Sequence, residues 1–402
     1  MSSHYDVLIA GGGMVGGTLA CALGDSGLKV GVIEPQAAIP APAGYDLRVS
    51  AITLASQTVF ENLGVWAGIR ARRMAPVVAM RVWEDGGVLH FDSADIGEAC
   101  LAWIIENSVI VAALAERLAR LPNVQVLTGA RLAAAGFGEE EVVVSLEDGR
   151  TLSTALLVGA DGAESRVRRE AAIPWSRHDL GQTAMVATVR TERPHAFRAY
   201  QHFLATGPLA FLPLDDPHQV SIVWSADTAR AADLMQLDDR AFNLELQAAF
   251  GDLLGNVQLA STRAAIPLAL GFARHYTAAR VALVGDAAHT VHPLAGQGVN
   301  LGILDAATLA GQLQQAARGR HDIGARSGLR RYERARKGAN LGMQLTTGAF
   351  RYLFGAQLPG AHFVRATGLR VTEHLPLLKG FFMRHASGLE GERPALARRI
   401  QK

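Results

Sequence analysis

The sequence predicts an α/β fold in which a parallel-sheet unit is interrupted by a second, strand-rich α+β unit. Three separate segments each place a short apolar strand directly before a glycine-containing loop, at residues 5–16, 155–168 and 281–305. Strands that alternate with helices in this way are typical of a parallel sheet with helices on its faces. Residues 176–270 are instead rich in alternating and apolar strand patterns, which indicates a separate sheet.

The first segment has the pattern of a dinucleotide-binding βαβ unit. An apolar strand, Tyr5–Ala10, is followed by GGGMVG, a helical run and a second apolar strand. Within this GxGxxG pattern, Gly11 suits the tight turn, Gly13 the approach of a pyrophosphate, and Gly16 close packing of helix on strand. Glu34 ends the second strand, where an acid would hold ribose hydroxyls. This context on both sides predicts a dinucleotide site.

The last segment, VALVGDAAHTVHPLAGQGVNLGILD at 281–305, predicts a ligand loop that opens into a helix. Gly296 and Gly298 allow the backbone to approach a ligand closely. The helix that starts near Asn300 directs its N-terminal N–H groups at the loop, which suits an electron-rich, partly anionic ring. Asp286 follows the strand, where its carboxylate can accept hydrogen bonds from sugar-like hydroxyls.

The middle segment is DGAESRVR at 161–168, directly after an apolar strand at 155–160. An Asp-Gly pair taken singly indicates only a turn. Together with GxGxxG and its acid before it, and GDAAHxxxPxxGQGxNxGxxD after it, the order and spacing resemble the group A flavoprotein monooxygenases. Within that group the chain is similar to the ubiquinone-biosynthesis hydroxylases almost from end to end. The similar stretches are LRVSAITLAS (47–56), LGVW (63–66), IIENSVI (104–110), TVRTERPH (188–195), LAFLPLDDPHQVSIVWS (209–225) and YERARK (332–337).

The resemblance implies the fold of para-hydroxybenzoate hydroxylase. That fold has a Rossmann-type FAD domain, an inserted β-sheet substrate domain and C-terminal helices. The resemblance also implies one FAD, NADPH or NADH as reductant, and transfer of one oxygen atom of O2 to an aromatic ring through a flavin C4a-hydroperoxide. Because the sequence has no second GxGxxG, the reductant is expected to visit transiently, or electrons to come from a protein donor.

Site residues follow from the same resemblance. Arg48 is expected near the FAD pyrophosphate and flavin, because a guanidinium donates two hydrogen bonds to a diphosphate. Asp161 is expected to support the cofactor region, with a strand-end turn as the alternative. His292 and Pro293 are expected beside the isoalloxazine ring and nearest the chemistry, Pro293 at its reacting edge. The expected cofactor set is Gly11, Gly13, Gly16, Glu34, Arg48, Asp161, Asp286, Pro293, Gly296, Gly298, Val299 and Asn300.

A metal site is the alternative interpretation of the same loop, since His289 and His292 have HxxH spacing. The sequence suggests no third ligand, and a flavin explains the loop better, so no metal is predicted. His289 is expected to be structural and to bond to backbone near the loop.

The predicted substrate is a polyprenylated phenol of ubiquinone biosynthesis, because IIENSVI and DDPH…SIVWS are most similar to the branch that hydroxylates 2-polyprenylphenols. The alternatives are another ring position, a phenol outside quinone synthesis, or another FAD oxidoreductase such as a prenyl reductase or halogenase. The WxWxIP motif expected of a halogenase is absent. A non-catalytic binding protein is a third class, but such a protein need not retain Glu34, Arg48, Asp161 and Asp286 together.

Composition limits the partners and the location. The chain has 402 residues, 49% of them apolar, so it can bury a large core. A net charge of +2 gives no electrostatic case for nucleic acid. Cys21 and Cys100 are expected to be reduced core thiols of a cytoplasmic protein. The sequence contains no run of 18 apolar residues, so no membrane-spanning helix is predicted.

A lipid-tailed substrate also suggests contact with a membrane. Residues 363–389 mix apolar and basic side chains and could form a basic amphipathic helix at the inner face of a membrane. An ordinary helix packed on the FAD domain is the alternative, and other ubiquinone-pathway proteins and an oligomer stay open as partners. The basic run at 325–337 is expected to be a solvated helix face.

The expected domains are discontinuous along the chain. A helix is predicted at 104–120, and helices are predicted from about residue 330 onward. Trp224 is expected either to line a substrate cavity or to pack in the core. The FAD-binding domain is predicted at 1–70, 101–175 and 271–330, the substrate domain at 71–100 and 176–270, and a C-terminal helical region at 331–402.

Overall fold

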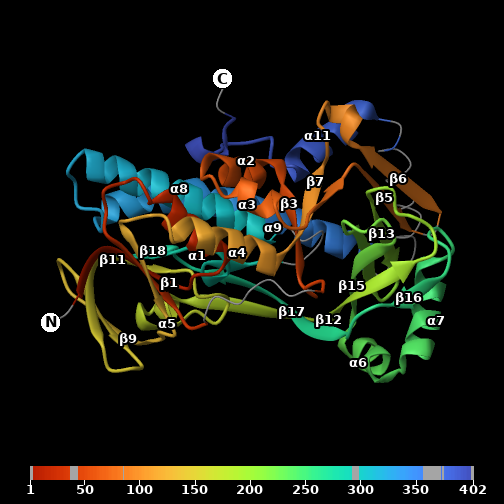
Figure 1. Ribbon diagram of the computed structural model, residues 1–402, viewed down its shortest axis with the longest axis horizontal. Helices are drawn as coiled ribbons and strands as arrows, with labels where there is room; N and C mark the ends of the chain where they lie inside the picture. Colours follow the sequence, from red (N-terminus) through yellow and green to blue (C-terminus); the bar gives the residue numbers. More distant parts are fainter. Residues whose placement is uncertain are drawn as a thin grey trace.

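Two large sheets lie side by side in the computed structural model, which describes residues 3–36, 44–84, 86–291, 298–355, 373 and 375–399. The long strands β12 (Trp175–Thr191) and β17 (Ala264–Ala273) run between the two halves of the molecule (Figure 1). They pair with each other from Trp175 to Val186, with an irregularity between Asp179 and Gln182. Both belong to the second sheet and reach back toward the first.

The first sheet has a parallel centre in the order β19-β11-β1-β2-β8, and β18 pairs antiparallel beside β19. An antiparallel pair, β9 and β10, extends it through β11. Its strands are β1 Ser3–Ala10, β2 Val30–Glu34, β8 Val124–Thr128, β9 Leu132–Phe137, β10 Val142–Leu146, β11 Thr151–Gly159, β18 Thr277–Ala278 and β19 Val281–Leu283.

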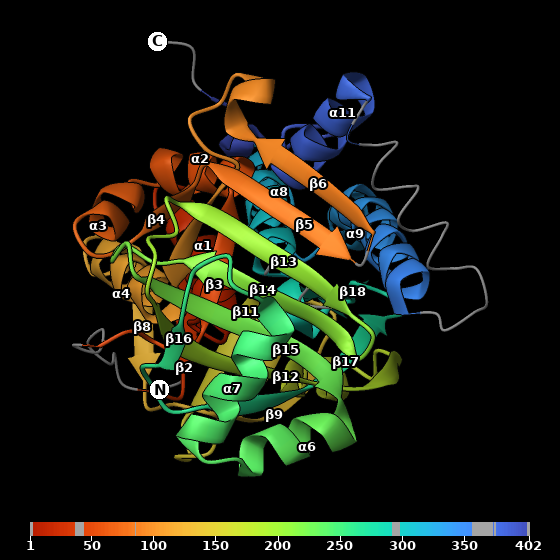
Figure 2. The ribbon, with the colours of Figure 1, turned by 90° about the vertical axis from the view of Figure 1, so that its right-hand side faces the viewer.

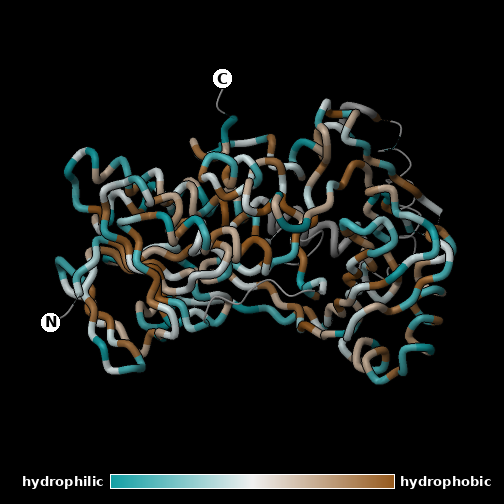
Figure 3. Tube along the Cα trace, in the orientation of Figure 1, coloured by the Kyte–Doolittle hydropathy of each residue, from teal (hydrophilic) through white to brown (hydrophobic). Residues whose placement is uncertain are grey.

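The central strands of this sheet read as continuous apolar runs because both of their faces are covered. Val7, Leu8 and Ile9 of β1 are completely buried. In Figure 3 hydrophobic residues, coloured brown, gather along the strands of this sheet. Because β1, β2 and β11 are parallel, their carboxyl ends meet at one edge. That edge carries the loops predicted to bind the dinucleotide.

The second sheet is mostly antiparallel, in the order β20-β17-β12-β15-β14-β13-β5-β6, with β16 beside β12. Its side chains alternate between two faces, as the period of two requires. One face packs on helices α6 (Thr228–Gln236) and α7 (Asp239–Phe250) at the outer end of the molecule (Figures 1 and 2). Its remaining strands are β5 Ala79–Glu84, β6 Gly87–Asp92, β13 Arg198–Leu204, β14 Gly207–Pro213, β15 Gln219–Asp227, β16 Val257–Leu259 and β20 His289–Thr290.

The structure decides between the two alternatives predicted for Trp224, the cavity lining and the core. It is buried on the face that packs against Phe242 of α7, with ring centroids 6.1 Å apart. It therefore belongs to the core and does not line the cavity described below. The two helices α6 and α7 supply the helical part of the α+β unit that was predicted as strand-rich at 176–270.

A small third sheet has the strand order β3-β7-β4. Its last strand in sequence shows that the helix predicted at 104–120 begins later than expected. Its strands are β3 (Val49–Thr53), β4 (Ala75–Val77) and β7 (Ala102–Glu106). Residues 104–106 pair antiparallel with β3, and helix α4 begins only at Asn107. The β-branched pair Ile104-Ile105 is buried there, as suits a strand. The predicted domain limits themselves stay a prediction.

Helices cover the first sheet and complete the C-terminal part. Helix α8 packs against α1 and α9, and α1 also packs against α4. Among the described residues no helix combines the length and apolarity needed to cross a bilayer. The helices and helical turns are α1 Met14–Ala22, α2 Leu54–Asn62, α3 Trp66–Arg70, η1 Ser93–Ile96, α4 Asn107–Leu118, α5 Arg166–Glu170, η2 Gly285–Ala287, α8 Gly298–Arg318, α9 Arg326–Gly355, α11 Pro376–Ala386 and η4 Ala395–Ala397.

Helix α9 corrects the expectation that 325–337 is only a solvated face. Arg330 and Arg334 are exposed, but Tyr332 and Arg336 are buried. The Tyr332 hydroxyl donates to the Leu283 carbonyl oxygen at 2.7 Å. The basic composition concealed a helix with one face in the core.

Both cysteines are buried and unpaired, as predicted. Burial raises the pKa of Cys21 to about 12 and that of Cys100 to about 11. Both thiols therefore stay protonated near neutral pH and are poor nucleophiles.

Candidate functional site

The loop after β1 has the backbone that a bound diphosphate requires. Gly11 has a φ of +99°, and a Cβ there would lie 2.4 Å from the Ala160 carbonyl oxygen. A Cβ on Gly16 would lie 1.9 Å from the Gly11 carbonyl oxygen. Gly13 faces open space, with no described protein atom within 4 Å of the point that a Cβ would occupy. The two tight glycines shape the loop, while Gly13 leaves room for a ligand.

The start of α1 and the end of β2 complete this edge of the sheet. No side chain caps the N-terminus of α1, so its first N–H groups remain available to an anion. Glu34 accepts hydrogen bonds from the Gly12 N–H (2.7 Å) and the Gln36 N–H (2.8 Å). Its carboxylate therefore lies beside the glycine loop, at the position expected for the ribose.

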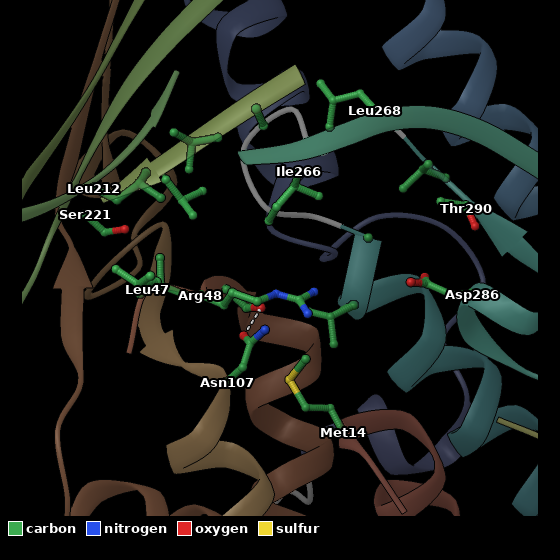
Figure 4. Close-up of a pocket in the computed structure, with 18 of the residues that line it drawn as sticks. Met14, Leu47, Arg48, Asn107, Leu212, Ser221, Ile266, Leu268, Asp286 and Thr290 are labelled. Carbon is green, nitrogen blue, oxygen red and sulfur yellow. Dashed lines mark hydrogen bonds between the residues drawn. The ribbon is translucent and has the colours of Figure 1, made fainter. Parts of the chain in front are cut away.

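A cavity of about 330 Å³ lies between this edge and the second sheet (Figure 4). On the side of the first sheet it is lined by loop and helix-start residues that include Gly13, Arg48, Asp286, Gly298 and Val299. Five of the predicted cofactor residues thus border one space, although they come from three distant parts of the sequence. The opposite wall is formed by side chains of Ala184, Val186, Gln201, Pro208, Ala210, Leu212, Ser221, Val223, Ser225, Ile266 and Leu268.

Arg48 and Asp286 are the titratable residues among the described lining of this cavity. In Figure 4 the Arg48 side chain extends through the middle of the site, with Asp286 beyond it. The Asp286 side chain is accessible from the cavity but is otherwise surrounded by protein. This burial raises the pKa of Asp286, and the charges of His289 and Arg48 oppose the increase. No hydrogen bond joins the Arg48 guanidinium to another described residue, so its donors remain available.

The side chain of Asp161 caps the N-terminus of helix α5. Its Oδ2 accepts from the Arg166 N–H (2.7 Å) and the Val167 N–H (3.1 Å) at the start of α5. Its Oδ1 is buried without a partner among the described residues. The predicted turn is therefore part of its role, and one carboxylate oxygen is left over for another group.

Arg168, three residues beyond the Ser165 cap, connects this segment to the strand end that carries Asp286. Its Nη1 donates to the Ala287 carbonyl oxygen at 2.9 Å, and its guanidinium lies 3.8 Å from the centre of the Trp175 ring. Burial lowers the pKa of Arg168. Its contacts fix the backbone directly after Asp286.

Asn300 uses its side chain inside the protein. Its Oδ1 accepts from the Thr53 N–H (3.0 Å), and its Nδ2 donates to the Ala51 carbonyl oxygen (2.8 Å). These bonds fasten the first turn of α8 to β3, so only the backbone of Asn300 is free for a cofactor. The helix begins at Gly298, two residues before the expected start. His292, Pro293 and Gly296 lie outside the described residues.

Asp305 is the centre of a buried ionic network behind the cavity. Its carboxylate accepts from His289 Nε2 (2.5 Å), Arg336 Nε (2.7 Å) and Asn340 Nδ2 (3.1 Å). It also accepts from the Gly285 N–H at 3.2 Å. The expectation that His289 bonds to backbone is wrong, because its ring is held by this carboxylate.

The pKa of Asp305 reflects two opposing effects. Burial by itself would raise that pKa, but the charges and hydrogen bonds of His289 and Arg336 outweigh it and hold the pKa well below its usual value. The carboxylate is therefore ionised, and it joins the strand end at 285 to α8 and α9.

The arrangement fits FAD: an open glycine loop, an uncapped helix start, an acid at the end of β2, and an unpaired arginine beside a cavity. A family model for the FAD binding domain matches residues 4–346. The ubiquinone hydroxylase UbiL of Rhodospirillum rubrum is 40% identical over 403 residues, covering 98% of this chain and 93% of that protein. The chain belongs to the FAD-dependent monooxygenases of the ubiquinone-biosynthesis hydroxylase family.

Further relatives agree with this family. The 3-demethoxyubiquinol 3-hydroxylase of Escherichia coli is 35% identical, with 96% of this chain and 98% of that protein covered. The p-nitrophenol 4-monooxygenase PnpA of Pseudomonas putida has the same fold, with a TM-score of 0.81 at 19% identity over 98% of this chain and all of PnpA. PqsL of P. aeruginosa in complex with 2-aminobenzoylacetate gives a TM-score of 0.78 at 27% identity, covering 91% of this chain and all of PqsL.

Glu106 and Arg73 hold the segment that carries Arg48, and the sequence alone did not predict this role for them. We call this pair the clamp. The buried carboxylate of Glu106 accepts from the Asp46 N–H (2.7 Å) and from Arg73 at Nε (2.9 Å) and Nη2 (3.0 Å). Arg73 Nη2 also donates to the Gly44 carbonyl oxygen at 2.8 Å. A paired acid and base far apart in sequence leave no local signal. Only the fold shows that they clamp residues 44–48.

Replacing Glu106 with alanine is expected to lower FAD affinity about tenfold, equivalent to about 1.4 kcal/mol. The change removes the carboxylate that accepts from both Arg73 and the Asp46 N–H, so the segment no longer holds Arg48 in place. Fluorescence titration of the apoprotein with FAD measures the effect. Glu116→Ala is the control, because Glu116 forms an exposed ion pair with the neighbouring Arg72 and should leave the affinity unchanged. A destabilised Glu106→Ala protein with wild-type FAD affinity would contradict the positioning role.

Proposed function

We propose that this FAD-dependent monooxygenase hydroxylates the aromatic ring of a polyprenylated phenol in ubiquinone biosynthesis. The observation that carries the proposal is the wall facing the cofactor residues. It consists of small apolar side chains with a few neutral polar ones, and no titratable side chain of the second sheet is part of the described lining. Such a wall suits a neutral aromatic ring with an apolar substituent. The names of the relatives supply the substrate class.

The cofactor would be held by residues around one edge of the first sheet. The loop containing Gly11, Gly13 and Gly16 and the start of α1 would bind the diphosphate, with Glu34 at the ribose. The guanidinium of Arg48 would bind the pyrophosphate and flavin, and Asp286 the ribityl hydroxyls.

The remaining predicted residues belong to the flavin end of the site. Gly298, Val299 and the N–H groups around Asn300 would face the flavin at the positive end of α8. Asp161 supports the region through its cap of α5. The proposal also includes His292 and Pro293 as predicted neighbours of the flavin ring, and Gly296 as the glycine predicted to let the backbone approach the cofactor.

FAD supplies the activation of O2 and the transfer of one oxygen atom to the ring. The balanced reaction consumes one phenol, one O2, one NADPH or NADH and one proton, and yields the hydroxylated phenol, water and the oxidised nucleotide. The chain orients the ring against the wall of the second sheet and keeps water away from it, because Ala184, Val186 and Val223 line the space. The protein itself then contributes to the rate by positioning the ring.

The deciding experiment is a product assay on the FAD-loaded protein with NADPH, a short-chain 2-prenylphenol and 18O2. Mass spectrometry and NMR should show one labelled hydroxyl on the ring, and 18O-labelled water under unlabelled O2 should label nothing. Consumption of NADPH with only hydrogen peroxide as product would exclude this phenol as the substrate.

A ring that already carries oxygen substituents is the second candidate. The E. coli relative, a 3-demethoxyubiquinol 3-hydroxylase, favours it. A short-chain demethoxyubiquinol tested under the same conditions separates the two, because coupled product should form with only the correct ring.

Peripheral contact with a membrane also belongs to this proposal. On α11, Phe381 is 55% exposed, and Leu375 just before the helix is 47% exposed. Two of the basic residues of that segment are already engaged: Lys379 forms an ion pair with Asp95 (3.0 Å), and Arg384 donates to the Ile96 carbonyl oxygen (3.4 Å). Any membrane contact through α11 would therefore depend more on its exposed apolar side chains than on these two charges.

A further inference from the structure

The wall of the second sheet that faces the cavity has a polar end and an apolar end. Gln201 of β13 lies opposite Ala210 of β14, which lies opposite Val223 of β15, which in turn lies opposite Val186 of β12. This row therefore runs across four strands and carries one polar side chain, at its β13 end. At the other edge β17 contributes Ile266 and Leu268.

Gln201 is buried but has no partner among the described residues of the protein. Its residue is 6% exposed, and its side chain lines the cavity. The amide therefore faces the cavity and does not bond within the protein. An amide that donates and accepts into a cavity is available to a ligand that offers it hydrogen-bonding groups.

The other polar side chains of the wall are less suited than Gln201 to hydrogen-bond a substrate ring. Ser221 and Ser225 also line the cavity without hydrogen bonds to described residues, but they lie in the rows on either side, Ser221 opposite Leu212 of β14 and Ser225 opposite Ala184 of β12. Figure 4 shows the Ser221 hydroxyl at the same end of the cavity as Leu212. A serine hydroxyl can also donate and accept, but Gln201 has the longest polar side chain of the wall and carries its donor and its acceptor on separate atoms. It can accept from a phenol O–H and donate to an adjacent ring oxygen.

We propose that Gln201 is a specificity-determining residue that hydrogen-bonds the oxygenated edge of the substrate ring, and that the apolar substituent extends toward Ile266 at the β17 edge. The assignment rests on the proposed function. Strands are about 4.8 Å apart, so the wall from β13 to β17 spans about 19 Å, longer than one ring. Ile266 is 36% exposed, so the apolar end of the wall is the open one.

The test compares Gln201→Leu with the wild type by flavin absorbance titration of the FAD-loaded proteins. The two ligands are a short-chain 2-prenylphenol and the matching prenylbenzene, which lacks the ring oxygen. The variant should bind the phenol about 10- to 100-fold more weakly and the prenylbenzene with unchanged affinity. Gln182→Leu is the matched control on the same sheet. The Gln182 amide donates to the Thr206 carbonyl oxygen (3.4 Å) outside the cavity lining, so both affinities should stay unchanged.

Thermal unfolding in the absence of the phenol gives an independent readout. Because leucine removes an unpaired amide, the melting temperature of Gln201→Leu should equal or exceed that of the wild type. A lower melting temperature would mean that the amide serves the fold and would overturn the assignment. Equal loss of affinity for both ligands, or no loss for the phenol, would overturn it too.

Failure of the proposed function would look different. It would appear in the wild type as phenol binding without labelled product under 18O2, while the dependence of phenol binding on Gln201 persisted. A wild type that binds neither ligand would overturn both proposals.

Discussion

Asp305→Ala is expected to lower the free energy of unfolding by about 3–5 kcal/mol. The change leaves Arg336 and His289 buried without their common carboxylate, and removal of one partner of a buried ion pair costs far more than the pair contributes. Both partners are almost inaccessible, at 4% and 1% of their side-chain surface. Urea denaturation at neutral pH measures the loss. Asp148→Ala, which removes an exposed ion pair with Arg150, should leave the midpoint unchanged.

The same carboxylate should contribute to the pH dependence of stability. Its pKa is lowered in the folded protein, so its contribution is present above the ordinary pKa of about 4 and is lost as the pH falls through the lower folded value. The wild type should therefore lose stability on acidification below about pH 4, and the difference between wild type and Asp305→Ala should shrink there. A difference that stays constant down to about pH 2 would contradict the ionised network.

Gly16→Ala is expected to abolish stable FAD binding, with a loss of at least about 100-fold, equivalent to about 2.7 kcal/mol. The new Cβ would lie 1.9 Å from the Gly11 carbonyl oxygen and 3.1 Å from Ala160 Cβ. These are backbone and packed atoms of the β1 loop and the end of β11, so the helix must move away from the sheet and the loop loses its shape. Flavin content after purification and FAD titration of the apoprotein measure the effect.

Gly13→Ala separates the shape of the loop from room for the ligand. No described protein atom lies within 4 Å of that Cβ position, so the apoprotein should keep its melting temperature while FAD binds more weakly. Gly311→Ala is the control, since it also faces open space but lies in the middle of α8. It should leave FAD binding unchanged and raise the stability slightly. A Gly13→Ala protein with wild-type affinity would exclude a close ligand approach at that position.

Local patterns were sufficient for the parts of the fold whose conformation depends on neighbouring residues. The strand of β1, the glycine turn and the start of α1 follow from a short apolar run and from the motif glycines Gly11, Gly13 and Gly16, because sterics at those glycines permit few alternatives. The expected strands in 176–270 were found because their residues carry the alternating and apolar patterns of strands, as in β12 and β15. At 104–106 the apolar run suits strand and helix equally, and pairing with β3 decided it.

Short-range spacing and motifs with close backbone constraints were enough to predict the family, the glycine loop at the edge of the first sheet and most of the strands. Tertiary structure alone decided what lies opposite that edge. Gln201 is an ordinary polar residue in a strand until the sheet places it in the cavity, and Arg336 belongs to a basic run until α9 turns it toward Asp305. Glu106 and Arg73 likewise meet only through the three-stranded sheet. Pairing and burial between distant segments create the unpaired amide, the buried ion network and the clamp, and no local pattern encodes such contacts.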